Sequence, residues 1–148
     1  MSNLKKILLN KICCKSVWFM RQAGRYLPEF QRIRDKNPNF IKLCLDSKLS
    51  SEITLQPIKR FNLDSAIIFS DILMVPYALG QEVKFLKGQG PMLSNFNFSS
   101  FEKKKKKEFS KQLSPVYKAI DITRKSLDKE KSLISFIGAP WTLLVYMF

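Results

Sequence analysis

The sequence predicts an α/β fold in which strands pair in parallel. Two short, continuously apolar runs, at residues 64–70 and 132–138, are typical of strands buried on both faces. A long helical stretch at 101–128 lies between them. A strand, a long helical connection and a second strand form the β-α-β pattern of parallel sheets that are covered by helices.

The first elements are a helix, a loop and a second helix. A short amphipathic helix is the simplest interpretation of residues 1–16, whose apolar stretch is too broken by polar residues to be a secretory signal. An exposed loop is expected from residue 17, because Gly24 interrupts regular structure. The next helix is predicted at 28–34 and ends before an Asn-Pro-Asn sequence.

Helical spacing continues up to the first predicted strand. Residues 40–61 carry apolar side chains at near-helical intervals, and Pro57 predicts a kink or two abutting helices. The strand at 64–70 is followed directly by Asp71. A short helix is then expected up to residue 79, ended by Gly80.

The segment between the two strands contains a predicted hairpin and a predicted long helix. Residues 82–86 alternate polar and apolar side chains, which indicates an edge strand or a hairpin arm before a turn at 88–91. Residues 94–100 are expected to be irregular. The helix at 101–128 is expected to bend at Pro115.

The last elements are the strand at 132–138 and a helix that starts at Pro140. This apolar end is shorter than a membrane span, which needs about 20 residues, and Gly138 and Pro140 interrupt it, so no membrane association is expected. Two strands are too few for a covered parallel sheet, and the chain stops at Phe148 within an apolar segment. We therefore expect the front portion of a larger protein.

The charge is strongly positive. The 148 residues include 26 Lys or Arg and 12 Asp or Glu, for a net charge of +14. Five consecutive Lys at 103–107 are more typical of a solvated helix face than of a nucleic-acid site, because Arg forks and interleaved aromatic residues are missing from the run. No nucleic-acid partner is expected.

Histidine and cysteine content excludes several kinds of site. The chain has no His, so it cannot hold a Ser-His-Asp triad or a His-ligated zinc by itself. Cys13, Cys14 and Cys44 show no C-x-x-C spacing, which argues against a disulfide framework or a thiolate metal site. This cysteine usage fits the reducing cytoplasm.

Two places carry candidate functional residues. Asp71 follows the first strand, at the sheet edge where parallel α/β folds bind ligands, although it could instead cap the next helix. Arg21 and Arg25 stand four residues apart, and two guanidinium groups presented together suit carboxylates or phosphates. The alternative for this pair is ordinary surface salt bridges with Glu29 and Asp35.

Three segments follow one family pattern in order. They read VWFMRQAGRYLPEFQRIR at 17–34, TLQPIKRFNLDSAIIFSDILMVPYALGQEVKF at 54–85 and FIGAPWTLLVYM at 136–147. With these segments the chain resembles the N-terminal part of the uroporphyrinogen decarboxylase family, and MRQAGRYLPE together with FSDIL is highly specific. The resemblance implies that residues 1–148 are the N-terminal part of a single (β/α)8 TIM-barrel domain with a helical N-terminal extension, whose C-terminal part is absent.

The resemblance also implies an activity. Members of the family are lyases of porphyrin and heme biosynthesis that decarboxylate the four acetate side chains of uroporphyrinogen III to give coproporphyrinogen III. They act in the cytoplasm as homodimers, without a metal or cofactor. Because a barrel needs about 250 residues or more, the 148-residue chain is expected to have an open sheet and little activity alone.

The same resemblance assigns roles to particular residues. Asp71 is the catalytic residue, which accepts hydrogen bonds from pyrrole N–H groups and stabilises positive charge in the transition state. Tyr146, which by position alone is more typical of a core or interface aromatic, becomes a polar contact to the substrate. The substrate-binding loop comprises Arg21, Gln22, Ala23, Gly24 and Arg25.

Two other functions fit part of the sequence. A related barrel family contains corrinoid-dependent methyltransferases, which use zinc, but its members are not expected to combine the RQAGR loop with FSDI. A non-enzymatic basic binding protein would show affinity that falls steeply with salt and that survives replacement of Arg21 and Asp71.

Overall fold

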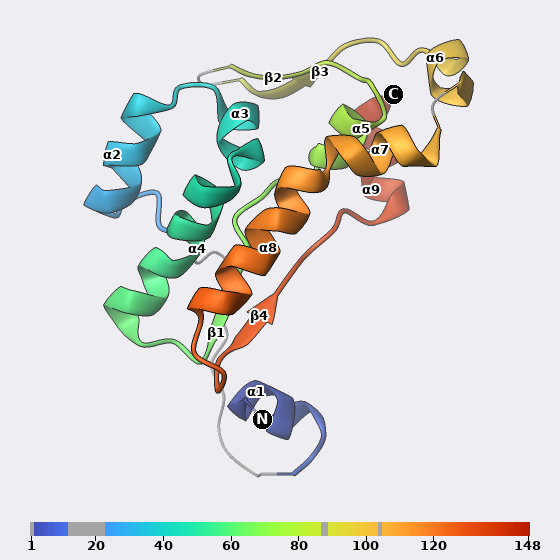
Figure 1. Ribbon diagram of the computed structural model, residues 1–148. Helices are drawn as coiled ribbons and strands as arrows, with labels where there is room; N and C mark the ends of the chain where they lie inside the picture. The colour runs from blue at the N-terminus through green and yellow to red at the C-terminus, as the bar shows by residue number, and fades with distance from the viewer. Residues whose placement is uncertain (1, 12–22, 87–88, 104) are drawn as a thin grey trace.

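The computed structural model describes residues 2–11, 23–86, 89–103 and 105–148, and within them the chain forms helices around two small sheets (Figure 1). The helices are α1 (Asn3–Leu8), α2 (Pro28–Lys36), α3 (Phe40–Leu45), α4 (Ser47–Phe61), α5 (Met74–Ala78), α6 (Phe98–Lys103), α7 (Lys106–Gln112), α8 (Ser114–Ser126) and α9 (Pro140–Met147). The strands are β1 (Ser65–Ile67), β2 (Val83–Leu86), β3 (Gly90–Leu93) and β4 (Ser132–Ile134).

The predicted parallel pair is confirmed. Strands β1 and β4 pair in parallel, with Ala66 opposite Leu133, and the helices α5 to α8 lie between them in the chain. Each strand is shorter than predicted, because pairing covers only three residues of each apolar run. Strand β4 is half-buried and not buried on both faces as predicted, since in the described part of the chain β1 is its only neighbour.

Helices α4 and α8 lie side by side across the β1–β4 pair, as Figure 1 shows, and α4 packs against both α8 and β1. A buried hydrogen bond joins the two helices: the hydroxyl of Thr123 on α8 donates to that of Ser51 on α4, at 2.9 Å. Ala119 is fully buried, and so is Thr123 one turn later, so small side chains let the helices approach closely.

The helical stretch at 40–61 is two abutting helices, one of the two predicted outcomes, but the break is not at Pro57. It lies at Asp46, whose Oδ1 accepts hydrogen bonds from the backbone N–H groups of Lys48 and Leu49, both at 3.0 Å. This N-cap satisfies two donors that a helix start leaves unpaired. Pro57 stays inside α4, where it is buried.

The prediction of one long helix at 101–128 is wrong. The segment contains α6, α7 and α8, and α6 already starts at Phe98, in a stretch predicted to be irregular. Lys105 has an extended backbone at the start of α7, within the Lys run, where like charges one turn apart disfavour a continuous helix. The expected bend at Pro115 is a new helix start, with Pro115 in the first turn of α8.

The smaller predictions hold. Helix α2 starts at Pro28, α5 ends before Gly80, and Pro140 starts α9. Strands β2 and β3 form an antiparallel hairpin in which Val83 lies opposite Leu93. None of the helices in the described ranges is long and apolar enough to cross a membrane.

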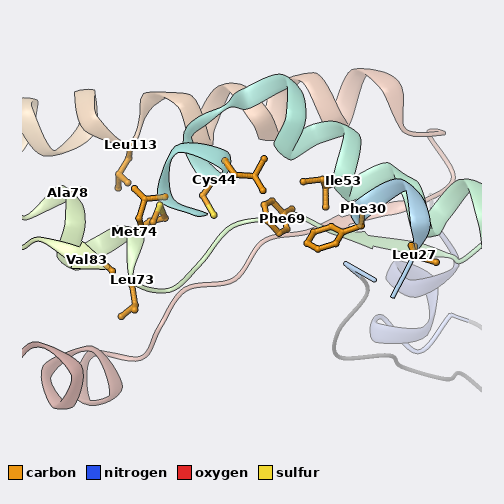
Figure 2. Close-up of a cluster of buried hydrophobic side chains, with 12 residues drawn as sticks. Leu27, Phe30, Cys44, Ile53, Phe69, Leu73, Met74, Ala78, Val83 and Leu113 are labelled. Atoms are coloured by element: carbon orange, nitrogen blue, oxygen red, sulfur yellow. The ribbon is translucent and has the colours of Figure 1, made fainter. Parts of the chain in front are cut away.

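The main core surrounds the chain just after β1. Figure 2 shows its labelled side chains, which come from α2 to α5 and the residues just before α2 and α5, from the Phe69 segment, from β2 and from the junction of α7 and α8. The ring of Phe69 meets Phe30 and Phe40 edge-on, with centroids 6.1 and 5.8 Å away. The fully or nearly fully buried members are Leu27, Leu43, Cys44, Ile53, Leu73 and Ala78.

Helix α1 lies at the opposite end of the strands, beside their first residues (Figure 1). Ser2 is buried, and its hydroxyl lies 2.5 Å from that of Ser132 at the start of β4. Asn3 donates to the carboxylate of Asp64, just before β1, at 3.4 Å. These contacts leave the carboxyl ends of β1 and β4 as the open end of the sheet.

Candidate active site at the carboxyl ends of β1 and β4

Two hydroxyl groups of α4 hold the backbone that leads from β1 to Asp71. The N–H of Phe69 donates to the hydroxyl of Thr54 at 2.8 Å, and the C=O of Phe69 accepts from the hydroxyl of Ser50 at 2.6 Å. Ile68 bonds instead to Ile134 of β4, so Phe69 presents its backbone to the other side of the strand. We call Ser50 and Thr54 the hydroxyl clamp.

Asp71 is half-buried two residues beyond Phe69, which the hydroxyl clamp holds. Its Oδ1 accepts a hydrogen bond from the N–H of Leu73 at 2.8 Å, and its C=O accepts from Met74 at the start of α5. The capping alternative is therefore partly correct, since the carboxylate closes a turn before the helix. This one bond uses only part of the capacity of a carboxylate, which has about four acceptor positions.

Burial dominates the electrostatics of Asp71. Loss of water around the carboxylate raises its pKa above the ordinary 3.8, while the Leu73 hydrogen bond and the charge of Arg25 lower it. The negative charge of the Asp71 carboxylate also affects the pKa of a neighbouring thiol. The pKa of the buried Cys44 thiol is raised to about 12, chiefly by burial and further by the negative charge of Asp71.

The described part of the predicted substrate-binding loop is a tight turn onto α2. The C=O of Gly24 accepts from the N–H of Leu27 at 2.8 Å. A Cβ on Gly24 would lie 2.6 Å from Cγ of Leu27, which is 1% exposed and cannot move aside. Glycine is thus required here, and the turn presents the exposed Arg25 and leaves Ala23 packed against the core.

The salt-bridge alternative for Arg25 does not hold with Glu29. The carboxylate of Glu29 is taken by Arg60 in a two-pronged ion pair, with N–O distances of 3.0 and 2.8 Å, which lowers the pKa of Glu29. None of the ion pairs among the described residues includes Arg25 or Asp35. Within the described part of the chain, the guanidinium of Arg25 is therefore available to a ligand.

The ends of the two strands approach each other closely at Gly138. A Cβ on Gly138 would lie 3.2 Å from Cβ of Ile72 and 2.6 Å from Cδ2 of Leu143. Gly138 therefore lies close both to Ile72, the residue after Asp71, and to Leu143 of α9. Helix α9 carries Tyr146, whose side chain is 44% exposed and makes no hydrogen bond or ring contact with another described residue.

The structure brings some of the predicted site residues together. Arg25 lies near enough for its charge to act on Asp71, and the turn at Gly24 holds it there. Tyr146 is on a helix that packs against α5, the helix after Asp71, and no hydrogen bond joins Tyr146 to Asp71. Arg21 and Gln22 lie outside the described residues, so their predicted roles stay predictions.

Three residues beside the site were missed by sequence reasoning. Ser50 and Thr54 stand four positions apart on the inward face of α4, and polar residues on an otherwise apolar helix face are the signal that would have indicated them. Cys44 resembles any small buried residue in the sequence, and nothing there places it near Asp71.

The arrangement suits a ligand with N–H donors and negatively charged groups. A half-buried carboxylate with spare acceptor positions can bind N–H groups or an adjacent positive charge, because water competes weakly there. The Arg25 guanidinium can bind a carboxylate. In the described ranges, no three His, Cys, Asp or Glu side chains are grouped closely enough to hold a metal ion.

Known proteins resemble the chain strongly. The sequence profile of the uroporphyrinogen decarboxylase (URO-D) family matches residues 10–148. A uroporphyrinogen decarboxylase of Campylobacter fetus subsp. fetus is 49% identical over 133 residues, which cover 88% of this chain and 39% of the relative. One from Orientia tsutsugamushi is 50% identical over 131 residues, covering 88% and 38%.

The chain thus spans about two fifths of the length of the curated relatives that it matches, in their N-terminal portion. These relatives are named decarboxylases and not methyltransferases, so the corrinoid-dependent alternative is not favoured. The match includes the Gly24 turn, Asp71 and the Tyr146 helix. The chain belongs to the uroporphyrinogen decarboxylase family.

Proposed function

We propose that the chain forms the Asp71 side of the active site of a uroporphyrinogen decarboxylase, which converts the four acetate groups of uroporphyrinogen III to methyl groups. The observation that supports this most is the carboxylate of Asp71, half-buried at the carboxyl end of a parallel strand and bonded only to Leu73 within the described part of the chain. Its remaining acceptor positions suit the pyrrole N–H groups of a tetrapyrrole.

The arginine loop supports the same substrate. Uroporphyrinogen carries eight carboxylates, so a cationic group beside a pocket for N–H donors both attracts and orients it. Arg25 has this place, exposed on the Gly24 turn and close enough to act on Asp71. We assign Arg21, Gln22 and Ala23 to the same loop, and Tyr146 to a polar contact from α9.

Decarboxylation needs a group that accepts the electron pair of the broken C–C bond. A proton added to a pyrrole carbon gives a cationic ring. The bond between the acetate CH2 and its carboxylate then breaks, CO2 leaves, and the bonding electrons neutralise the ring. A proton on the CH2 carbon and loss of the ring proton complete the methyl group. We assign to ionised Asp71 the stabilisation of the ring cation, which needs no metal or cofactor.

The proposal includes the setting of this site. We propose that β1 and β4 are two strands of a (β/α)8 barrel, in which ligands lie at the carboxyl ends of the strands. The parallel β1–β4 pair with α8 packed beside it supports this, as does the family. The enzyme is further proposed to be a cytoplasmic homodimer.

A chimera tests the proposed function. Residues 1–148 replace the matched segment of the Campylobacter fetus relative, and decarboxylation is followed by separating the porphyrins after oxidation. We expect turnover by the chimera, and a loss of at least about 100-fold in kcat with Asp71→Asn, because the neutral amide no longer stabilises the cation. Circular dichroism should show an unchanged fold.

Asp64→Asn is the matched control. Asp64 stands at the other end of β1, where, among the described residues, its carboxylate accepts only from Asn3, so its replacement should leave kcat within about two-fold. Near-normal turnover of Asp71→Asn would contradict the assignment of Asp71. Equal losses for both variants would show that the effect comes from the strand and not from the site.

A further inference from the structure

Gln81 is a buried amide that joins three parts of the chain. The residue is 6% exposed. Its side-chain NH2 group donates to the C=O of Ser94 at 2.6 Å and to the C=O of Met147 at 3.0 Å, 13 and 66 positions away. An amide NH2 group has two N–H donors, and both find an acceptor here. Gln81 therefore links the segment after α5 to the end of β3 and to the end of α9.

The backbone around Gln81 is fixed on two further sides. The N–H of Gln81 donates to the C=O of Pro76 within α5, at 3.1 Å. The next residue, Glu82, donates its N–H to the hydroxyl of Ser94 at 3.1 Å, and its C=O accepts from the N–H of Ser94 at 3.0 Å. These two bonds extend the β2–β3 hairpin by one pair. The side chain of Gln81 thus starts from a fixed point between the hairpin and α5.

The bond to Met147 acts on the helix that carries Tyr146. Met147 is the last residue of α9, and the carbonyl groups of a last helical turn have no partner within their helix. Gln81 supplies a donor to one of these groups. Figure 1 shows the end of α9 beside α5, and the two helices are in contact. Gln81 therefore connects the helix that follows Asp71 with the helix that carries Tyr146.

The oxygen of the same amide is not satisfied. The side-chain oxygen of Gln81 is buried and has no hydrogen-bond partner among the described residues. A buried acceptor without a partner lowers stability, and an apolar side chain of similar length would contain no such group. What Gln81 provides is its pair of donors, directed at two backbone carbonyl groups. This favours a role in placing the two segments over a role in stability alone.

We propose that Gln81 is a positioning residue, which sets the place of Tyr146 relative to Asp71 by holding the end of α9. The inference rests on the proposed function, in which Tyr146 makes a polar contact to the substrate. Tyr146 has no hydrogen bond with another described residue and is 44% exposed, so α9 determines where its side chain lies. Asp71 is held by the turn that leads into α5. Because Gln81 is bonded to both helices, it fixes the spacing between the two groups.

The first test is kinetic and uses the chimera described above. Tyr146→Phe removes the proposed substrate contact and should raise KM about 5-fold, with kcat within about two-fold. Gln81→Met keeps the length of the side chain but removes both donors, and we expect the same rise in KM. Because the two residues act in series, the double variant should show a rise of about 5-fold and not the roughly 25-fold rise of independent effects. Gln89→Met, at an exposed position in the turn of the same hairpin, is the matched control and should leave KM unchanged.

Amide hydrogen exchange in the 148-residue chain tests the hold on α9 without any activity. Gln81→Met should speed the exchange of the backbone N–H groups in the last turn of α9 by at least about 5-fold. Exchange at the end of α8, where the N–H of Leu127 bonds to Thr123, should not change. The same results are expected with Gln81→Asn, whose shorter side chain keeps the amide but cannot reach both carbonyl groups, so the test does not depend on one variant.

Several results would overturn the proposal. They are unchanged exchange in α9, an unchanged KM for Gln81→Met in the active chimera, a loss confined to kcat, and effects of Gln81→Met and Tyr146→Phe that multiply. Faster exchange in α9 together with a chimera that has no turnover would leave the contact between Gln81 and α9 standing and contradict only the proposed function.

Discussion

The carboxylate of Asp71 is held between opposing influences. Burial favours its neutral form, whereas the Leu73 N–H and the Arg25 charge favour the ionised form, and burial is the largest of the three. The proposed role of Asp71, stabilisation of a cation, suits this setting, since a fully hydrated carboxylate would interact weakly with a bound cation. Because burial disfavours the charged form, ionised Asp71 destabilises the folded state.

The raised pKa of Asp71 predicts that the stability of the folded chain depends on pH. Because the pKa of Asp71 is raised above 3.8 in the folded chain, its favourable contribution is present below pH 3.8 and is lost as the pH rises through the folded pKa. Asp71→Asn removes the change of charge and keeps an oxygen for Leu73. We expect the variant to gain stability relative to the unchanged chain between pH 3 and pH 7, measured by urea unfolding.

Asp64→Asn again provides the comparison, because it removes a carboxylate from the same strand at the end away from the site. A stability difference for Asp71→Asn that stays constant with pH, or that changes in the opposite direction, would show that burial does not dominate at Asp71.

At the scale of elements, the hydroxyl clamp joins α4 to Phe69, two residues beyond the end of β1. Ser50 and Thr54 are both 1% exposed, and they satisfy the N–H and the C=O of Phe69 where β4 cannot reach. Thr54 also donates to the C=O of Ser50 within α4, at 2.7 Å. An unpaired backbone group in this core would cost about 1–3 kcal/mol.

The clamp predicts a contrast between two substitutions. Thr54→Val keeps the volume but leaves the Phe69 N–H without a partner, so we expect a loss of about 1–3 kcal/mol in the free energy of unfolding. Thr54→Ser keeps the hydroxyl and should lose no more than about 1 kcal/mol. Urea unfolding of the two variants distinguishes them, and equal losses would mean that the methyl group and not the hydrogen bond matters.

Elements were predictable where a local pattern determines them. The two apolar runs indicated β1 and β4, and Pro28 and Pro140 marked helix starts, because a proline in the first turn loses no helix hydrogen bond. The break at Asp46 was missed because Pro57 is the more obvious interruption. The clamp could not be predicted, since Thr54 and Ser50 bond to a residue 15 and 19 positions away.

For the molecule as a whole, positive charge is the main unfavourable long-range influence. The chain carries 26 basic and 12 acidic residues, and only three ion pairs form among the described residues. Lys103, Lys105, Lys106 and Lys107 are all exposed to solvent as predicted, but they belong to α6, the N-cap of α7 and α7 and not to one helix face. Repulsion among such charges opposes the compact state.

Salt should therefore stabilise the chain. Raising the ionic strength from about 0.01 M to 1 M shortens the screening length from about 30 Å to 3 Å, so we expect the Tm to rise with NaCl. Lys106→Glu with Lys107→Glu lowers the net charge from +14 to 14 − 4 = +10 and should weaken this dependence. A Tm that falls with NaCl, or a double variant with the full dependence, would refute the role of net charge.

The two sides of the β1–β4 pair also differ in their capacity to recruit other chains. On the β1 side, the clamp occupies the backbone of Phe69, so an incoming strand finds no free groups at that residue. On the β4 side, the backbone N–H and C=O of Leu133 have no partner among the described residues, and they lie within a segment, residues 132–148, that has no charged side chain. Aggregation of this chain should accordingly start at the edge of β4. A charged residue or a proline introduced on β4 would suppress it, whereas the same substitution near β1 would not.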